Sequence, residues 1–266
     1  MQDGDLYEIY AVKYGEIAER AMSENMIGGD PHDMSGQLDF YVWAVIGRSR
    51  TFLVDTGFNH ETAALRNRKI QRLPREGLAL VGVDAGAVRD VIVTHLHNDH
   101  AGTLSDFPNA RFHLQEQEME YATGRCMCHE VMRAPYQVDD VCTMVRKVYA
   151  GEVTFHDGDA QLAPGVSIHL IGGHAKGLMS VRVETRRGPV VLASDAAHFY
   201  ANMEQRRPFP IVYNVPDLLA GFDRLEALAG APDRVVPGHD PRVLHRYPAV
   251  SEELRGIAAR LDADPA

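Results

Sequence analysis

The chain has few cysteines, no surplus of basic residues and no long apolar run. Only three of its 266 residues are cysteine (Cys126, Cys128 and Cys142), an odd number that fits a reducing compartment better than secretion. No apolar stretch approaches the roughly 18 residues that a membrane helix needs. Residues 1–5 are acidic and polar, unlike the start of a signal peptide. We therefore expect a cytoplasmic protein without a membrane partner.

The charge balance excludes another class of partner. The chain has 27 Lys and Arg against 37 Asp and Glu, a formal net charge of −10 at pH 7. Nucleic-acid binding requires clustered Lys and Arg, so we expect no nucleic-acid partner. No repeat or linker divides the sequence, and its length is sufficient for a substantial core. A single α/β domain over residues 1–266 is the simplest arrangement.

Short apolar segments separated by turn residues predict many strands. These segments are 6–13, 39–46, 51–55, 91–94, 111–114, 153–155, 166–171, 178–184, 189–193 and 234–237. Propensity and helical spacing predict helices over 115–121, 216–229 and 251–261, with Ser251 as the N-cap of the last. Segments 15–37 and 125–150 fit neither pattern well. We expect these two to be insertions that cover a pocket.

The densest cluster of reactive side chains follows the strand predicted at 91–94. Residues 94–102 read Thr-His-Leu-His-Asn-Asp-His-Ala-Gly, so four potential metal ligands (His95, His97, Asp99 and His100) fall within six residues. Alternate side chains of an extended backbone point the same way, which brings His95 and His97 together. Imidazoles and a carboxylate suit zinc or a similar divalent ion, with enough ligands to begin a second site. The alternative, a solvated polar loop, does not account for so many histidines.

Single polar residues follow three later strands. His174, Asp195 and His239 each come just after an apolar run, and glycines beside the two histidines allow close approach of the backbone. Taken alone, a histidine at a strand end is more often a surface or hydrogen-bonded residue. The three therefore gain meaning only as a set with the first motif.

The H-x-H-x-D-H motif followed by His, Asp and His at later strand ends resembles the metallo-β-lactamase superfamily. The resemblance implies an αββα sandwich, in which two mixed β-sheets pack face to face with helices outside. It also implies two divalent ions, most often Zn²⁺, with Mn²⁺, Fe²⁺ and Co²⁺ as alternatives. The implied ligands are His95, His97 and His174 for one ion, Asp99, His100 and His239 for the other, and Asp195 between them.

Two cations about 3.5–4 Å apart can share a hydroxide and polarise a carbonyl, which is the chemistry of a hydrolase. Asp55, at the end of the strand 51–55, is expected to orient a ligand histidine. The alternative is that Asp55 caps the turn at Thr56 and Gly57. The sequence does not decide between these two roles.

Departures from other branches favour one group within the superfamily. His97 stands where flavodiiron oxygen reductases have glutamate, and Asp195 where the best-known zinc β-lactamases have cysteine. The chain is most similar to the quorum-quenching lactonases, which open N-acyl homoserine lactones. We therefore expect hydrolysis of such a lactone or a related small one. Hydrolysis of another ester, a thioester, a phosphodiester or a β-lactam is an alternative, as is a non-catalytic metal-binding module.

One residue departs from that group. The lactonases have a tyrosine three residues after the bridging aspartate, whereas this chain has His198 there and Tyr200 two residues later. We expect His198 and Tyr200 to bind the substrate, together with Met26 and Trp43. His198 could donate a proton to the leaving alkoxide, as could Asp99, or it could be structural. Apolar and aromatic residues could line an acyl pocket, although core packing is the alternative for each: Met22, Met26, Phe40, Trp43, Met132, Tyr136, Phe209 and Tyr213. A homodimer formed through segment 15–37 is a further possibility.

Overall fold

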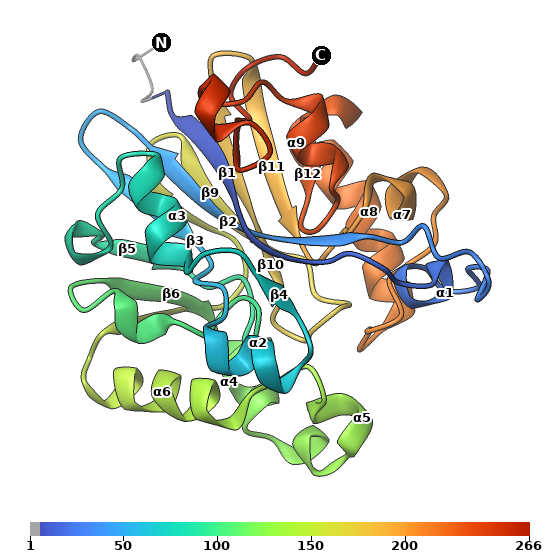
Figure 1. Ribbon diagram of the computed structural model, residues 1–266. Helices are drawn as coiled ribbons and strands as arrows, with labels where there is room; N and C mark the ends of the chain where they lie inside the picture. The colour runs from blue at the N-terminus through green and yellow to red at the C-terminus, as the bar shows by residue number, and fades with distance from the viewer. Residues whose placement is uncertain (1–5) are drawn as a thin grey trace.

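Two β-sheets form the centre of the protein in the computed structural model, which describes residues 6–266 (Figure 1). Residues 1–5, on which the expectation of no signal peptide rests, lie outside the described part. The larger sheet is mixed, with the strand order β13-β1-β2-β3-β5-β6-β7 and β4 paired to β1. Its strands are β1 (Glu8–Ile17), β2 (Leu38–Ile46), β3 (Thr51–Val54), β4 (Lys69–Ile70), β5 (Asp90–Ile92), β6 (Arg111–Gln115), β7 (Val153–His156) and β13 (Ala258–Arg260).

The smaller sheet is also mixed and has the order β12-β11-β10-β9-β8. Its strands are β8 (Ala160–Ala163), β9 (Val166–Leu170), β10 (Met179–Thr185), β11 (Gly188–Ser194) and β12 (Val235–Pro237). Neighbouring strands are antiparallel except β11 and β12, which run parallel. Two mixed sheets with helices outside confirm the predicted sandwich, whereas β8 was not predicted.

Strand β2 shows how the sequence builds two cores. Its residues Tyr41 and Trp43 pack between the sheets, together with Val181 of the smaller sheet. Phe40 and Val42 point to the opposite face and pack under the helices of the larger sheet. Because side chains alternate along a strand, β2 must be apolar on both faces, and it therefore appears as a nearly continuous apolar run.

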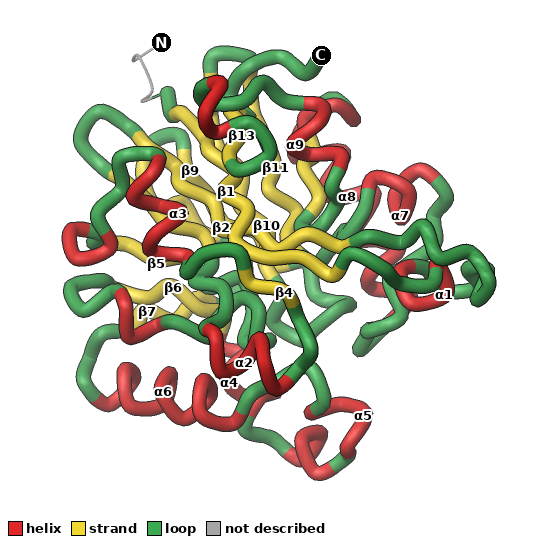
Figure 2. Tube along the Cα trace, in the orientation of Figure 1, coloured by secondary structure: helices red, strands yellow, loops and turns green. Residues whose placement is uncertain are grey.

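Helices lie on the outer faces of both sheets (Figure 2). Helix α8 packs on the smaller sheet, while α2, α3, α4 and α6 contribute buried residues to the outer core of the larger sheet. The helices are α1 (Met22–Asn25), α2 (His60–Leu65), α3 (Pro74–Leu80), α4 (Glu116–Ala122), α5 (Glu130–Arg133), α6 (Val138–Tyr149), α7 (Tyr200–Glu204), α8 (Val215–Ala229) and α9 (Arg242–Arg246). Within residues 6–266, none has both the length and the apolar character to cross a membrane.

The helix predicted over 251–261 is wrong. A short 3₁₀ turn over Glu252–Leu254 is followed by β13, which pairs antiparallel with β1. Gly256 has a φ of 74°, which ends any helix at that point, and Ser251 makes no capping hydrogen bond through its side chain. Ala258 and Ala259 of β13 pair with β1 and are buried, as is Leu261.

The carboxyl ends of several strands meet at one edge of the sandwich. Strands β3 and β5 are parallel neighbours in the larger sheet, and β11 and β12 are parallel neighbours in the smaller one. Parallel neighbours end at the same edge of a sheet, so the loops that follow them lie together. The loops after these four strands, and the loop after β9, contain every polar residue that the sequence analysis singled out at a strand end.

Candidate metal centre

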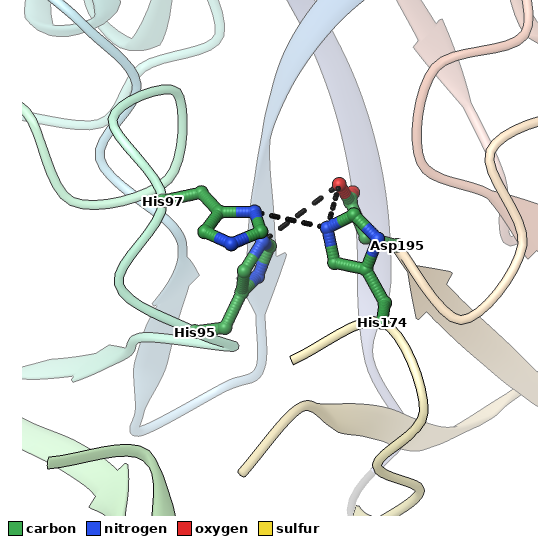
Figure 3. A group of neighbouring side chains, drawn as sticks. All are labelled: His95, His97, His174 and Asp195. Atoms are coloured by element: carbon green, nitrogen blue, oxygen red, sulfur yellow. Dashed lines mark hydrogen bonds and ion pairs between the residues drawn. The ribbon is translucent and has the colours of Figure 1, made fainter. Parts of the chain in front are cut away.

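The predicted metal ligands converge from separate loops into one buried cluster. Together with His198, which was not predicted as a ligand, they form three groups, and within each group all ligand atoms lie within 4.8 Å of one another. Figure 3 shows the first group, with His95 and His97 opposite His174 and Asp195. The groups are His95, His97, His174 and Asp195; Asp99, His100 and His239; and Asp195, His198 and His239.

Asp195 lies between the first two groups and presents one oxygen to each. Its Oδ2 is 3.1 Å from His174 Nε2 and 3.7 Å from His95 Nε2. Its Oδ1 is 3.2 Å from His100 Nε2 and 3.0 Å from His239 Nε2. A carboxylate placed in this way can serve two neighbouring cations at once.

The pKa shifts of His95, His97 and Asp195 suit metal ligation, whereas that of His100 runs the other way. Burial alone would lower the pKa of His100, but Asp195 and Asp55 outweigh it and raise that pKa well above its usual value. Burial and neighbouring imidazoles hold the pKa of His95 and His97 well below the usual value, so both rings are neutral. Burial alone would raise the pKa of Asp195, but His198 and the other surrounding imidazoles outweigh it and hold that pKa well below its usual range. Neutral imidazoles and an ionised carboxylate are the forms that bind divalent ions.

Several ring nitrogens also point inward without a hydrogen bond to occupy them. The Nε2 atoms of His95 and His100 are buried and have no hydrogen-bond partner among the described residues. His174 Nε2 and His97 Nδ1, by contrast, share a hydrogen bond of 2.9 Å. Unpaired buried nitrogens are costly in a protein interior, and a cation would satisfy them. The donor set therefore fits a dinuclear metal site of the kind that nitrogen and oxygen ligands prefer.

The outer nitrogens of three rings are held by acceptors outside the cluster. His100 Nδ1 lies 2.7 Å from Asp55 Oδ2. The Nδ1 atoms of His174 and His239 lie 2.7 Å and 2.8 Å from the backbone oxygens of Ile211 and Asp39. Such acceptors fix each ring so that Nε2 points inward.

Asp55 is also held from the other side. Its carboxylate accepts hydrogen bonds from the backbone N–H and the hydroxyl of Thr94, at 2.8 Å and 2.9 Å. Within the described residues, Thr56 and Gly57 donate no hydrogen bond to it. The contacts of Asp55 are therefore those of a residue that orients a histidine rather than those of a turn cap.

Glu118 was not predicted from the sequence, yet it connects the loops of the cluster. Its carboxylate accepts from the backbone N–H groups of Leu96 at 3.0 Å and Gly177 at 3.1 Å, and from the hydroxyl of Tyr136 at 2.9 Å. A Cβ on Gly177 would lie 2.2 Å from the backbone nitrogen of Glu118, so only glycine allows this approach. The available signal was the spacing of Glu118 with Tyr121 on the buried side of α4.

His198 lies directly beside the cluster. Its Nε2 is 3.0 Å from Asp195 Oδ2, and its ring stacks on Phe209 with a centroid distance of 3.6 Å. Burial lowers the pKa of His198 to about 3, although Asp195 opposes this. The ring is therefore a neutral imidazole near neutral pH and can act through an N–H group rather than as an imidazolium.

A cavity of about 360 Å³ opens onto the cluster. Two of the predicted pocket residues, Phe40 and Phe209, belong to its lining. The full lining is Arg20, Leu38, Phe40, Arg66, Arg68, His97, Asn98, Asp99, Val131, Ala134, Pro135, His174, Asp195, His198, Phe209, Ile211 and His239.

Three predicted substrate-binding residues lie away from this cavity. Trp43 is 1% exposed and packs between the sheets, because its position on β2 directs it to that face. Met26 lines a separate cavity beside α1. Tyr200 is buried under the guanidinium groups of Arg242 and Arg246. The structure gives none of the three a contact with this cavity.

Comparisons with known proteins agree with this geometry. The family model described as the metallo-beta-lactamase superfamily matches residues 38–239. An N-acyl homoserine lactonase of Agrobacterium fabrum is 32% identical over 131 residues, covering 48% of this chain and 47% of that protein. One from Bacillus thuringiensis is 31% identical over 153 residues, covering 57% and 52%. The chain thus spans about half the length of these two relatives. One from a Bacillus species is 29% identical over 211 residues, covering 72% and 74%.

Solved structures support the fold independently. A quorum-quenching N-acyl homoserine lactone lactonase superposes with a TM-score of 0.75 at 23% identity, covering 90% of this chain and 94% of the other. A dizinc quorum-quenching lactonase superposes with a TM-score of 0.69 at 16% identity, covering 88% of each chain. With the family match over most of its length, this chain belongs to the metallo-β-lactamase superfamily.

Proposed function

We propose that the protein is a hydrolase that uses two divalent ions to open a lactone, either an N-acyl homoserine lactone or a related small cyclic ester. The observation that carries the proposal is the position of Asp195, whose two oxygens face two separate groups of ligands. The similarity to N-acyl homoserine lactonases supports the choice of substrate class.

In this proposal His95, His97 and His174 would hold one ion, and Asp99, His100 and His239 would hold the other, with Asp195 as a ligand available to both. Zn²⁺ is the ion that we expect, and Mn²⁺, Fe²⁺ and Co²⁺ suit the same donors. When bound, the ions would lower the pKa of water and polarise the scissile carbonyl. The side chains of the protein must orient the lactone ring of the substrate and transfer a proton to the leaving oxygen.

Asp99 and His198 are the residues that we propose for the proton. Burial alone would raise the pKa of Asp99, but Arg68 and His100 outweigh it and hold that pKa well below the usual range. Asp99 is therefore a carboxylate that would accept a proton before passing it to the leaving alkoxide. His198 is neutral and would donate a hydrogen bond from an N–H to the carbonyl or the leaving oxygen.

We also propose that residues 1–266 form one domain in which two segments cover the pocket. Arg20, from segment 15–37, lies in the cavity lining, as do Val131 and Pro135 from segment 125–150. These contacts support the view that both segments shape the substrate site.

Hydrolysis of a lactone panel by zinc-loaded and manganese-loaded protein tests the proposal. Simple esters, thioesters, phosphodiesters and β-lactams should be measured beside the lactones. Asp157→Asn is the control, since it removes an exposed carboxylate that belongs neither to the ligand groups nor to the cavity lining. We expect the highest kcat/KM on lactones for wild type and the control alike. No turnover on any lactone refutes the function, and faster turnover of another class replaces it.

A further inference from the structure

Three arginines line the cavity that opens onto the metal centre. They are Arg20, Arg66 and Arg68, and the only carboxylates in the described lining are Asp99 and Asp195. Both carboxylates are metal ligands in the function proposed above. With those two committed to cations, the cavity has an excess of positive charge, although the whole chain has a net charge of −10.

Two of these arginines lie over aromatic rings that also contact the centre. The Cζ of Arg20 is 5.5 Å from the centroid of Phe209, and the ring of Phe209 also stacks on that of His198. The Cζ of Arg68 is 4.8 Å from the centroid of Phe40, which packs edge to face on His239. When an aromatic ring covers the face of a guanidinium group, the N–H edge of that guanidinium stays available to bind a ligand.

Arg20 has donors to spare. Its Nη2 donates to the backbone oxygen of Glu24 at 2.9 Å, while its buried Nε has no hydrogen-bond partner among the described residues. Within residues 6–266, no carboxylate oxygen lies within 4.0 Å of its guanidinium nitrogens. Burial lowers the pKa of Arg20, and the neighbouring charge of Arg68 lowers it further, against the opposing effect of Glu24. The half-buried guanidinium of Arg20 therefore has the like charge of Arg68 nearby, and the negative charges of Glu24 and Asp99 act on it only from a distance.

The other two arginines are more fully occupied. The buried Nε of Arg66 also has no hydrogen-bond partner among the described residues, but Arg66 donates to the backbone oxygens of Ala134 and Tyr136, both at 2.9 Å, and so holds the loop that leads into α6. Arg68 donates to Asn98 Oδ1 at 2.7 Å and lies 3.6 Å from Asp99 Oδ2. Arg20 is thus the arginine best placed to bind an incoming anion, with Arg68 as its neighbour.

We propose that the substrate has a carboxylate at a distance from its scissile carbonyl, and that Arg20 binds this carboxylate with the help of Arg68. The inference rests on the proposed function for the lactone ring, and on the cavity alone for the anionic group. A guanidinium edge binds a carboxylate through two parallel charge-assisted hydrogen bonds. The carboxylate would also give the guanidinium of Arg20 a negative partner in direct contact.

Matched pairs of lactones test this inference. Each pair consists of a butyrolactone with a carboxylate, on a linker of zero to three methylenes, and the corresponding neutral carboxamide. We expect wild type to prefer the carboxylate in at least one pair by about tenfold or more in kcat/KM, the effect of one charged hydrogen bond. Arg20→Met should bring this ratio close to one, and Arg20→Lys should retain part of it. Arg48→Met, which removes an exposed arginine in the turn after β2, should leave the ratio unchanged.

A binding measurement separates this inference from the proposed function. Calorimetric titration of the metal-loaded protein would use tetrahydrofuran-2-carboxylate, which has no scissile carbonyl, and its carboxamide. We expect carboxylate binding that Arg20→Met weakens about tenfold and Arg48→Met does not, with circular dichroism showing that each variant is folded. If no lactone is hydrolysed but this pattern holds, the function fails and the anion site stands. Equal rates on both members of every pair, or a preference that Arg20→Met retains, overturns the anion site.

Discussion

Replacing Glu118 by glutamine tests whether one buried carboxylate holds the loops of the metal centre together. Glu118 is fully buried and receives three hydrogen bonds, from Leu96, Tyr136 and Gly177. Leu96 separates His95 from His97 in the first loop, and Gly177 closely follows His174. Glutamine has nearly the same shape, so the substitution changes little besides the charge and one acceptor.

The expected cost follows from those contacts. A glutamine can keep its oxygen toward Leu96 and Tyr136, which then leaves its NH₂ group facing the Gly177 N–H. Losing one charge-assisted hydrogen bond costs about 1.5–3 kcal/mol, and the stranded N–H adds to this. A neutral amide is cheaper to bury than a carboxylate, and burial does raise the pKa of Glu118, so part of the cost is recovered. We expect a net destabilisation of about 2 kcal/mol.

Urea unfolding followed by circular dichroism gives the stability, and equilibrium dialysis gives the metal affinity. Without this carboxylate the loop that contains Leu96 and the loop that contains Gly177 would separate. We therefore expect metal affinity to fall about tenfold, the lower end of the range for losing a residue that holds a metal ligand in place. Glu116→Gln is the matched control, since Glu116 is exposed on the same helix. If Glu118→Gln unfolds within about 0.5 kcal/mol of the control, the carboxylate does not have this role.

Two further substitutions test separate parts of the account. Asp55→Asn removes the charged acceptor of His100 Nδ1, and we expect metal affinity in equilibrium dialysis to fall about 10- to 100-fold; wild-type affinity would contradict the orienting role. Burial and Asp139 raise the pKa of Asp140 to about 7, so between about pH 4 and 7 the folded state keeps a proton that the unfolded state has lost. Stability should therefore decline as pH rises through this window, by about 1 kcal/mol after allowance for solvent screening, and urea unfolding of Asp140→Asn should lack that decline. Parallel pH profiles for wild type and Asp140→Asn would refute this assignment.

The features that the sequence predicts well are local. Strand β5 and the motif after it are adjacent in the chain, and the later ligands His174, Asp195 and His239 each follow an apolar strand. Their order along the chain predicted that they meet only through its resemblance to the metallo-β-lactamase superfamily, in which such strand ends gather at one edge of the sandwich. The resemblance to a known family then supplied the division into two groups.

The features that the sequence did not predict depend on contacts between distant segments. The C-terminal apolar residues form β13 rather than a helix because β1 offers an unpaired edge. Trp43 belongs to the inner core because of the direction in which β2 faces. The alignment of Arg20 with Phe209 joins two loops that are far apart in the chain, and no periodicity in either loop indicates it.

The number of ions bound per chain tests the central claim most directly. Protein dialysed against zinc and then analysed by mass spectrometry should hold two ions per chain, because seven ligands divide into two groups around Asp195. Asp195→Asn should hold fewer than two, whereas Asp157→Asn, the exposed control, should still hold two. A single ion in wild type, or two ions retained by Asp195→Asn with unchanged affinity, would contradict the dinuclear site.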